Sequence, residues 1–247
     1  MKKFLIFVVL AVILLSACTK KVTPKDWEYL ASSMQKVDEI VQNELNRLQN
    51  IAASDVVKSG EWEEIKPALI LDAENRTEAL YWYCLPDGSY YTSEKDKVDA
   101  NLSSRGYFPD LLAGNAVVGY PIIGKTSGRK SFVIAVPIFD NQEVTGILGT
   151  SIFLGEMWDI LKNKISIPEE YDFYAVNTNG FTMFDLETKD HLLDDVLNQS
   201  SPTLVEAIKV IIASENGSVS YKWNDKNKIA IYKKSPVSDW RYVLSFY

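Results

Sequence analysis

Apolar residues repeat about every seven positions through residues 23–53, which is the longest periodic stretch in the chain. One row consists of Trp27, Met34, Val41 and Leu48, and the adjoining row of Leu30, Val37 and Ile51. This spacing predicts a long amphipathic helix that Thr23 caps and Pro24 begins, with Glu44 interrupting the stripe. The stripe packs either against the chain's own sheets or against a second copy, and packing within the chain is the simpler interpretation.

Five runs rich in Val, Ile, Tyr and Phe follow the helix, with turn residues between them. They cover residues 79–85, 89–92, 117–122, 130–138 and 144–153. This composition predicts β-strands, and short turns such as Pro86-Asp87-Gly88 predict antiparallel pairing. A five-stranded antiparallel sheet is therefore expected, with helices at residues 61–75 and 155–165 and a polar loop at residues 94–104.

A second set of strand signals begins after a break near residues 167–171. The runs at residues 171–177, 181–184, 218–223, 228–232 and 241–246 predict strands. Ser201-Pro202 predicts the start of a helix that ends near Ala213, and Asn216-Gly217 predicts a turn. The chain is thus expected to be an α+β protein with two unequal units, at residues 23–166 and 167–247.

The first 17 residues have the pattern of a signal peptide, with two lysines, an apolar run to Leu15 and small residues before Cys18. The run is too short to span a bilayer, which takes about 20 apolar residues. The sequence Leu15-Ser-Ala-Cys18 resembles the lipobox of bacterial lipoproteins. That resemblance implies cleavage after residue 17, lipidation of Cys18 and a tether over residues 18–22, in a protein anchored outside the cytoplasm at the outer or the cytoplasmic membrane. The alternative is an ordinary secretory signal with an incidental cysteine.

Charge and composition exclude several functions. A formal net charge of −7, with lysines clustered only in pairs, argues against nucleic acid as a partner. His191 is the one histidine, so a zinc site of the usual kind is not expected, and nothing points to a cofactor. Cys84 lies in an aromatic strand-like run, which favours a buried, inert thiol over a nucleophile.

A candidate binding site lies in the stretch Arg105-Gly106-Tyr107-Phe108, just before the strand that carries Tyr120. A guanidinium group surrounded by aromatic rings suits a carboxylate, because its planar fork donates two hydrogen bonds and the rings exclude water. The other interpretation is a helix start packed on the sheet, with the arginine in solvent. Composition alone favours this second interpretation.

The order of these residues resembles the double Cache family of extracytoplasmic sensor domains. The resemblance rests on Arg105-Gly-Tyr107-Phe108, Ala113-Gly114, Tyr120-Pro121 and residues 135–140 and 146–152. The family's usual pattern is Arg-x-Trp-Tyr, a later Tyr, an Ala-x-Pro strand and Gly-Val-x-Gly-x-Asp. The resemblance implies two PAS-like Cache lobes of antiparallel sheet on a long N-terminal helix. Residues 23–166 would form the membrane-distal lobe and residues 167–247 the smaller membrane-proximal lobe.

The same resemblance implies a ligand site in the first lobe, formed by Arg105, Tyr107, Phe108, Tyr120 and Ser151. Tyr107 stands where many members have Trp. Ser151 stands where the amino-acid-binding members have the Asp that holds the ligand's ammonium group. A carboxylate on Arg105 is therefore expected, without the partner that selects a free α-amino acid.

Three classes of function follow. The leading hypothesis is a lipid-anchored, extracytoplasmic protein that binds or senses a small, carboxylate-containing molecule and has no catalysis of its own. The alternative is an envelope interaction module that docks a receptor, or a second copy, through the helix at residues 23–53 without any ligand. A hydrolytic enzyme is the least supported class, because the sequence has neither a Gly-x-Ser-x-Gly nor a His-Glu-x-x-His motif and offers no catalytic residues to name.

Overall fold

The structure is a computed structural model that describes residues 21–71, 73–125 and 127–247, so Cys18 and the predicted signal peptide lie outside the described residues. The helices are α1 (Pro24–Ala52), α2 (Trp62–Ile70), α3 (Phe108–Leu112), α4 (Leu154–Lys164) and α5 (Pro202–Ala213), with short 3-10 helices at Asp55–Val57, Ala73–Asn75 and Val196–Asn198. The strands of the first half are β1 (Ala79–Cys84), β2 (Ser89–Thr92), β3 (Lys97–Asn101), β4 (Val117–Ile123), β5 (Lys130–Asp140) and β6 (Glu143–Phe153). Those of the second half are β7 (Tyr171–Val176), β8 (Thr182–Asp185), β9 (Asn216–Trp223), β10 (Lys226–Lys234) and β11 (Arg241–Phe246).

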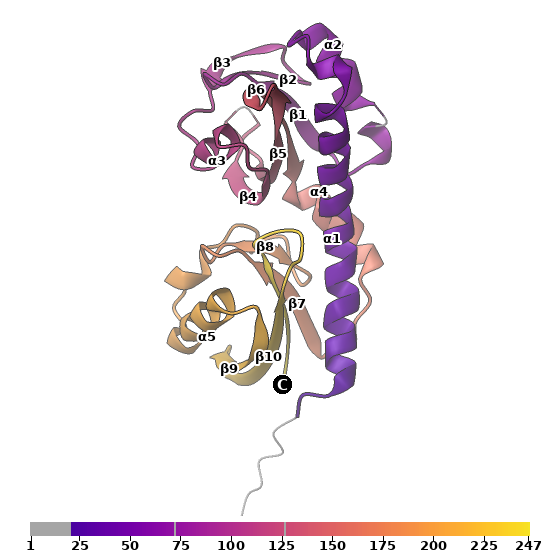
Figure 1. Cartoon of the computed structure of the whole chain (residues 1–247). Helices are drawn as coiled ribbons and strands as arrows, with labels where there is room; N and C mark the ends of the chain where they lie inside the picture. The colour runs from indigo at the N-terminus through magenta and orange to yellow at the C-terminus, as the bar shows by residue number, and fades with distance from the viewer. Residues whose placement is uncertain (1–20, 72, 126) are drawn as a thin grey trace, which may run out of the picture.

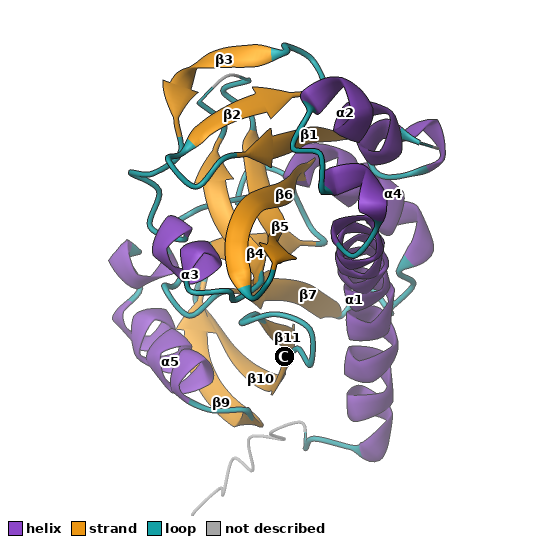
Figure 2. Cartoon of the chain, turned by 45° about the horizontal axis from the view of Figure 1, so that its top comes forward, coloured by secondary structure: helices purple, strands orange, loops and turns teal. Residues whose placement is uncertain are grey.

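The strands form two separate antiparallel sheets, which confirms the predicted α+β fold class (Figure 2). The order is β3-β2-β1-β6-β5-β4 in the first sheet and β8-β7-β11-β10-β9 in the second. Apart from the edge strand β3, the two orders match strand for strand, with β6 and β11 in equivalent central places. We call each sheet with its covering helices a lobe; the boundary at residues 166 and 167 stays a prediction.

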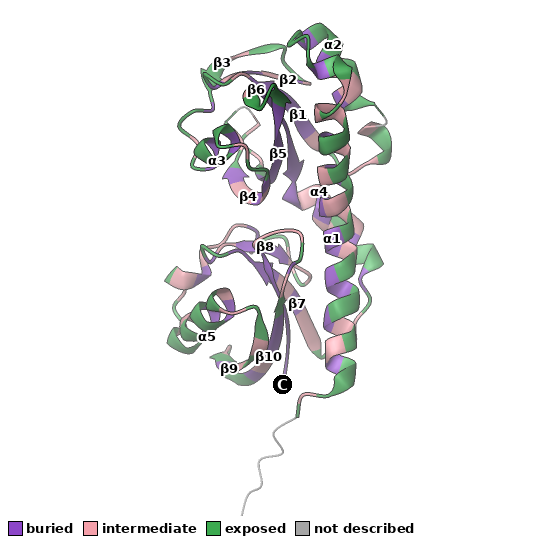
Figure 3. Ribbon diagram, viewed as in Figure 1, coloured by how far each residue is buried: buried purple, intermediate pink, exposed green. Residues whose placement is uncertain are grey.

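Helix α1 runs alongside both sheets (Figure 1). Its apolar stripe is buried: Leu30, Val37, Val41 and Leu48 have no exposed surface, and they belong to a core cluster that contains residues of both sheets. The face of α1 turned away from the sheets is exposed (Figure 3). The stripe therefore packs within the chain, as the simpler interpretation predicted.

Glu44, the polar residue that interrupts the stripe, is buried in a charged cluster between α1 and the first sheet. Its carboxylate pairs with Arg47 at 2.6 Å and with Arg76 at 3.3 Å, and it accepts a hydrogen bond from Thr150 Oγ1 at 2.5 Å. Both guanidinium groups also lie over the ring of Tyr81. Because a buried carboxylate is tolerated only when it is paired, this cluster fixes α1 in one position along the sheet.

The two lobes also contact each other directly, through Trp240. Its indole Nε1 donates to the carbonyl of Gly119 in β4 at 2.9 Å, and its ring packs edge-on against Phe132 in β5. Trp240 has no exposed surface. A second link is the hydrogen bond from Lys130 Nζ to the carbonyl of Leu192. Strands β4 and β5 of the first lobe are therefore held against the second lobe.

Three predicted elements were wrong in detail. Residues 94–104 are not only a loop, because they contain the edge strand β3, which makes the first sheet six-stranded. Its side chains are mostly exposed, so it carries no apolar pattern. The predicted helix at 61–75 ends at Ile70, because the ψ of Leu71, 126°, is not helical. Asn216 and Gly217 belong to strand β9, where they pair with Lys233 and Tyr232.

No helix in the described part of the chain is both long and apolar enough to cross a membrane.

Candidate functional site

A small cavity lies in the first lobe, on the sheet face opposite α1. The alternation of strand residues decides this placement, since Tyr81 and Tyr83 of β1 join the core beneath α1, whereas Trp82 and Cys84 join a second core with Tyr107 and α3. The cavity has a volume of about 30 Å³, and its lining includes Leu80, Trp82, Tyr90, Leu102, Arg105, Tyr107, Ile122, Lys125 and Ser151. Three of the five predicted site residues, Arg105, Tyr107 and Ser151, are thus brought together.

Arg105 reaches this cavity from the turn between β3 and α3. Its Nη2 donates to the carbonyl of Ile123 at 3.2 Å, while its Nε is buried and has no hydrogen-bond partner among the described residues. An unpaired donor on a charged group away from water is costly, and an acceptor bound in the cavity would remove that cost. Arg105 is half-buried, so part of its guanidinium group is in solvent while its Nε faces the interior.

Tyr107 forms a buried wall beside Arg105. Burial raises the pKa of its hydroxyl above the usual value, and the nearby guanidinium group of Arg105 opposes the shift. The hydroxyl therefore stays protonated at neutral pH and can act as a hydrogen-bond donor.

Tyr120 and Phe108 do not line the cavity as the structure describes it. Tyr120 packs edge-on against the ring of Tyr107, with the centroids 5.1 Å apart. Its hydroxyl lies over Gly106, where a Cβ atom would come within 2.6 Å of it, so a larger residue at this position would have to displace the Tyr120 hydroxyl. Phe108 is buried in the core under α3. Tyr120 therefore supports the ring of Tyr107.

Ser151 is bound to a residue that the sequence analysis did not name, Trp82. The indole Nε1 of Trp82 donates to Ser151 Oγ at 3.2 Å, and the ring covers Gly149 on the neighbouring strand. Strand alternation could have identified Trp82 as a site residue, because Trp82 and Ser151 lie on the same face of the sheet once β1 is paired with β6 in the observed register. That register was not known from the sequence.

The charge of the cavity favours an anion. Its described lining contains two cations, Arg105 and Lys125, and no carboxylate. Lys125 is already engaged, since its Nζ donates to the carbonyl of Asn101 and to Ser104 Oγ. A volume of about 30 Å³ holds roughly two ordered waters, so an organic ligand fits only if side chains such as Trp82 move.

Metal-binding groups, the free cysteine and the histidine were the other candidates for chemistry in the described parts of the chain. No group of three or more His, Cys, Asp or Glu side chains within residues 21–71, 73–125 and 127–247 is arranged to hold a metal ion. Cys84 is buried, and burial raises the pKa of its thiol to about 12, so it is inert as predicted. His191 is partly exposed and hydrogen-bonded to Asp185.

Solved structures of other proteins share the fold of this chain. The chain superposes on the sensory domain of the Campylobacter jejuni chemoreceptor Tlp3 with isoleucine bound, with a TM-score of 0.64 and 14% identity over 90% of each chain. It superposes on the ligand-binding domain of the Pseudomonas aeruginosa chemoreceptor PctB in complex with L-Gln with a TM-score of 0.72 and 14% identity, over 91% of this chain and 90% of that one. The fold is that of a double Cache domain.

The chain also superposes on the extracellular domain of rpHK1S-Z16, with a TM-score of 0.72 and 16% identity over 89% of this chain and 91% of that one. No protein-family model matches the sequence, and no curated protein matches it. At these identities the likeness establishes the fold, and the ligand must be argued from the cavity itself.

Proposed function

We propose that this chain is an extracytoplasmic, non-catalytic sensor protein that binds a small carboxylate-containing molecule in the first-lobe cavity. The carboxylate would accept hydrogen bonds from Arg105, with Tyr107 as a wall and donor and Ser151 at the far end of the ligand. A lipid on Cys18 would hold the protein at the membrane face.

The observation that carries the proposal is the buried, unpartnered Nε of Arg105 in a cavity whose described lining contains no carboxylate. Hydrogen bonds from a charged donor inside a water-poor site are stronger than those in solvent, so a ligand carboxylate gains most at this position. The double Cache fold adds support, since the superposed domains are ligand-binding parts of receptors.

Because of Ser151, we expect a different class of ligand from those of the superposed chemoreceptor domains, whose structures contain isoleucine and L-Gln. A serine hydroxyl that already accepts from Trp82 offers no negative charge to an ammonium group. We therefore expect simple carboxylates, or carboxylates with an uncharged tail, to bind more tightly than free α-amino acids.

The test is titration calorimetry on the full chain with a panel of carboxylates, each paired with its neutral amide, for example propionate with propionamide. For a carboxylate that binds, Arg105→Ala should weaken affinity about 10- to 150-fold, because hydrogen bonds to a charged group contribute roughly 1.5 to 3 kcal/mol. Stability should change little, since the substitution also removes an unpaired buried donor.

Lys95→Ala is the matched control, because it removes a positive charge from an exposed turn of the same lobe. Ser151→Asp adds the missing carboxylate and should increase affinity for α-amino acids. Equal affinity of wild type and Arg105→Ala, or tight binding of an α-amino acid by the wild type, would contradict the proposed site. Failure of every carboxylate to bind would favour the ligand-independent interaction module.

A further inference from the structure

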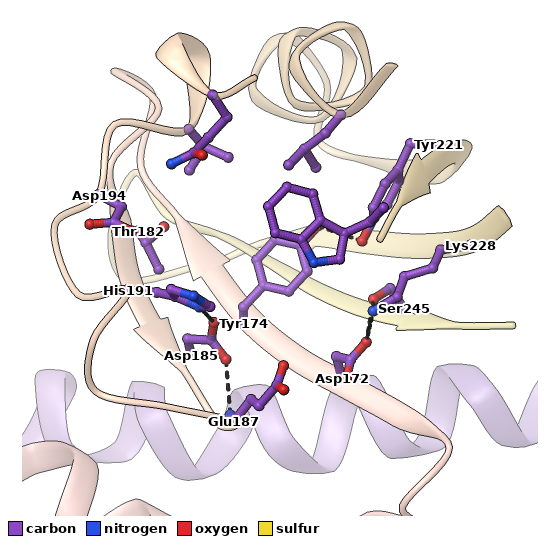
Figure 4. A pocket seen from close by; sticks show the side chains of 14 residues that line it. Asp172, Tyr174, Thr182, Asp185, Glu187, His191, Asp194, Tyr221, Lys228 and Ser245 are labelled. Atoms are coloured by element: carbon purple, nitrogen blue, oxygen red, sulfur yellow. Dashed lines mark hydrogen bonds and ion pairs between the residues drawn. The ribbon is translucent and has the colours of Figure 1, made fainter. Parts of the chain in front are cut away.

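The second lobe contains a larger cavity, of about 140 Å³, to which the proposed function assigns no role. Its lining comes from β7, β8, β9, β10 and β11 and from the connection between β8 and α5. Figure 4 shows the side chains that surround it, among them Asp172, Tyr174, Glu187 and Tyr221. This cavity has room for a small organic molecule as the structure stands.

The position of this cavity in its sheet is equivalent to that of the first-lobe cavity. In the first lobe, Ser151 of the central strand β6 pairs with Leu80 of β1, and both line the cavity. In the second lobe, Ser245 of the central strand β11 pairs with Asp172 of β7, and both line the larger cavity. The two cavities therefore occupy corresponding places in two lobes of matching strand order, each on the sheet face opposite α1.

The charge of the second cavity is opposite to that of the first. Four carboxylates line it, from Asp172, Asp185, Glu187 and Asp194, against two basic groups, Lys228 and His191. Lys228 forms an ion pair with Asp172, and Nδ1 of His191 lies 2.6 Å from Asp185. Both pairs are drawn in Figure 4.

The two pairs leave an excess of negative charge. The imidazole of His191 donates to the Asp185 carboxylate, and this hydrogen bond raises the pKa of His191. At Lys228, burial lowers the pKa, but the hydrogen bond and ion pair with Asp172 outweigh burial and raise it. Each basic group is therefore matched by its own carboxylate. The side chains of Glu187, which is exposed, and Asp194, which is half-buried, have no hydrogen-bond or ion-pair partner within the described part of the chain. These two carboxylates are therefore left without a matching basic group.

The remaining lining is suited to an organic cation. Tyr174, Tyr221 and Trp223 supply aromatic surface, and cations bind favourably over the faces of such rings. Thr182 is only 6% exposed and lines the cavity, yet its hydroxyl has no hydrogen-bond partner among the described side chains. Figure 4 shows Thr182 beside Asp194 and His191. The hydroxyl is therefore available to a polar ligand atom in the cavity.

From these observations we infer that the second-lobe cavity is a binding site for a small organic ammonium ion, held by Glu187 and Asp194 against the rings of Tyr174, Tyr221 and Trp223. A metal ion is the weaker occupant, because the carboxylates of the described lining are not arranged as a metal-binding group. The site is independent of the proposed carboxylate site, since the two share no residues.

The test is titration calorimetry on the full chain with choline, ethanolamine and 1,4-diaminobutane. Choline is compared with 3,3-dimethylbutan-1-ol, which has the same shape and no charge. At least one ammonium ion should bind, and the neutral alcohol should bind at least about 10-fold more weakly than choline if choline binds. The comparison of choline with the alcohol requires no variant, so it remains decisive if a substitution unfolds the protein.

The double variant Glu187→Gln, Asp194→Asn should weaken binding of the ammonium ion by about 10-fold or more, whereas Asp190→Asn, an exposed carboxylate of the same loop, should have no effect. Binding should persist in Arg105→Ala, which separates this site from the one in the first lobe. The inference fails if none of the three ammonium ions binds, if the alcohol matches choline, if the double variant binds as wild type does, or if calcium competes with the ammonium ion for the cavity.

Discussion

Gly149 and Trp82 give the sharpest test of how the first-lobe cavity is built. A Cβ atom at position 149 would lie 2.1 Å from Cζ2 and 2.2 Å from Cε2 of the Trp82 ring. Ordinary carbon contacts begin near 3.4 Å, so the overlap in Gly149→Ala is larger than an ångström. Neighbours give way by only a few tenths of an ångström in a packed core, and the indole ring must therefore leave its place.

The expected cost of Gly149→Ala follows from two contributions. Overpacking a filled core typically costs about 1 to 3 kcal/mol. Displacement of the ring also breaks the hydrogen bond from Trp82 to Ser151, which contributes roughly 0.5 to 1.5 kcal/mol. The free energy of unfolding should therefore fall by about 2 to 4 kcal/mol.

Trp82→Phe should partly rescue Gly149→Ala, because phenylalanine lacks the outer atoms that collide with the new methyl group. Alone, Trp82→Phe should cost about 1 to 2 kcal/mol through the lost hydrogen bond and the space it leaves. The double variant should be more stable than the sum of the single effects predicts, by about 1 to 2 kcal/mol, as expected for residues in direct contact.

Equilibrium urea unfolding, followed by far-UV circular dichroism, measures all three variants against wild type. Gly155→Ala is the control, because a methyl group there meets no atom within 4 Å. It should leave stability unchanged or raise it slightly. The reasoning is refuted if Gly149→Ala is as stable as Gly155→Ala, or if the effects of Gly149→Ala and Trp82→Phe simply add.

Two further predictions concern the contact of α1 with the second lobe and the anchor. Asp38 is buried and its Oδ1 accepts from Ser235 at 2.7 Å and Tyr242 at 2.6 Å; burial raises its pKa, although both hydrogen bonds oppose the shift. The folded state therefore destabilises the charged form of Asp38, by an amount that is full above the folded pKa and disappears below the unfolded pKa. Asp38→Asn should be more stable than wild type at neutral pH and should lose that advantage on acidification. Asp38→Leu leaves two hydroxyls unpaired and should lower the free energy of unfolding, measured in urea, by about 2 to 5 kcal/mol. Cys18→Ser should move the protein from the membrane fraction to the soluble fraction, and a variant that stays fully membrane-bound would contradict the lipid anchor.

Local pattern alone was enough to predict most of the elements. The seven-residue spacing on α1 and the β-branched and aromatic runs depend on residues within one element, and such signals can be read without knowing what the element packs against. The edge strand β3 was missed for the same reason, because its side chains are exposed and its strand conformation comes from pairing with β2. The strand propensities of residues 97–101 contain no information about a partner strand elsewhere in the sequence.

The composition of the sites was decided by tertiary structure. The sequence named Arg105, Tyr107 and Ser151, but only the pairing of β1 with β6 places Trp82 over Gly149 and against Ser151. No pattern in the sequence singles out Glu187 or Asp194, and the second lobe brings them to one cavity with Tyr221 and Lys228. Strand register sets which side chains share a face, and register depends on long-range pairing that no short stretch of sequence contains.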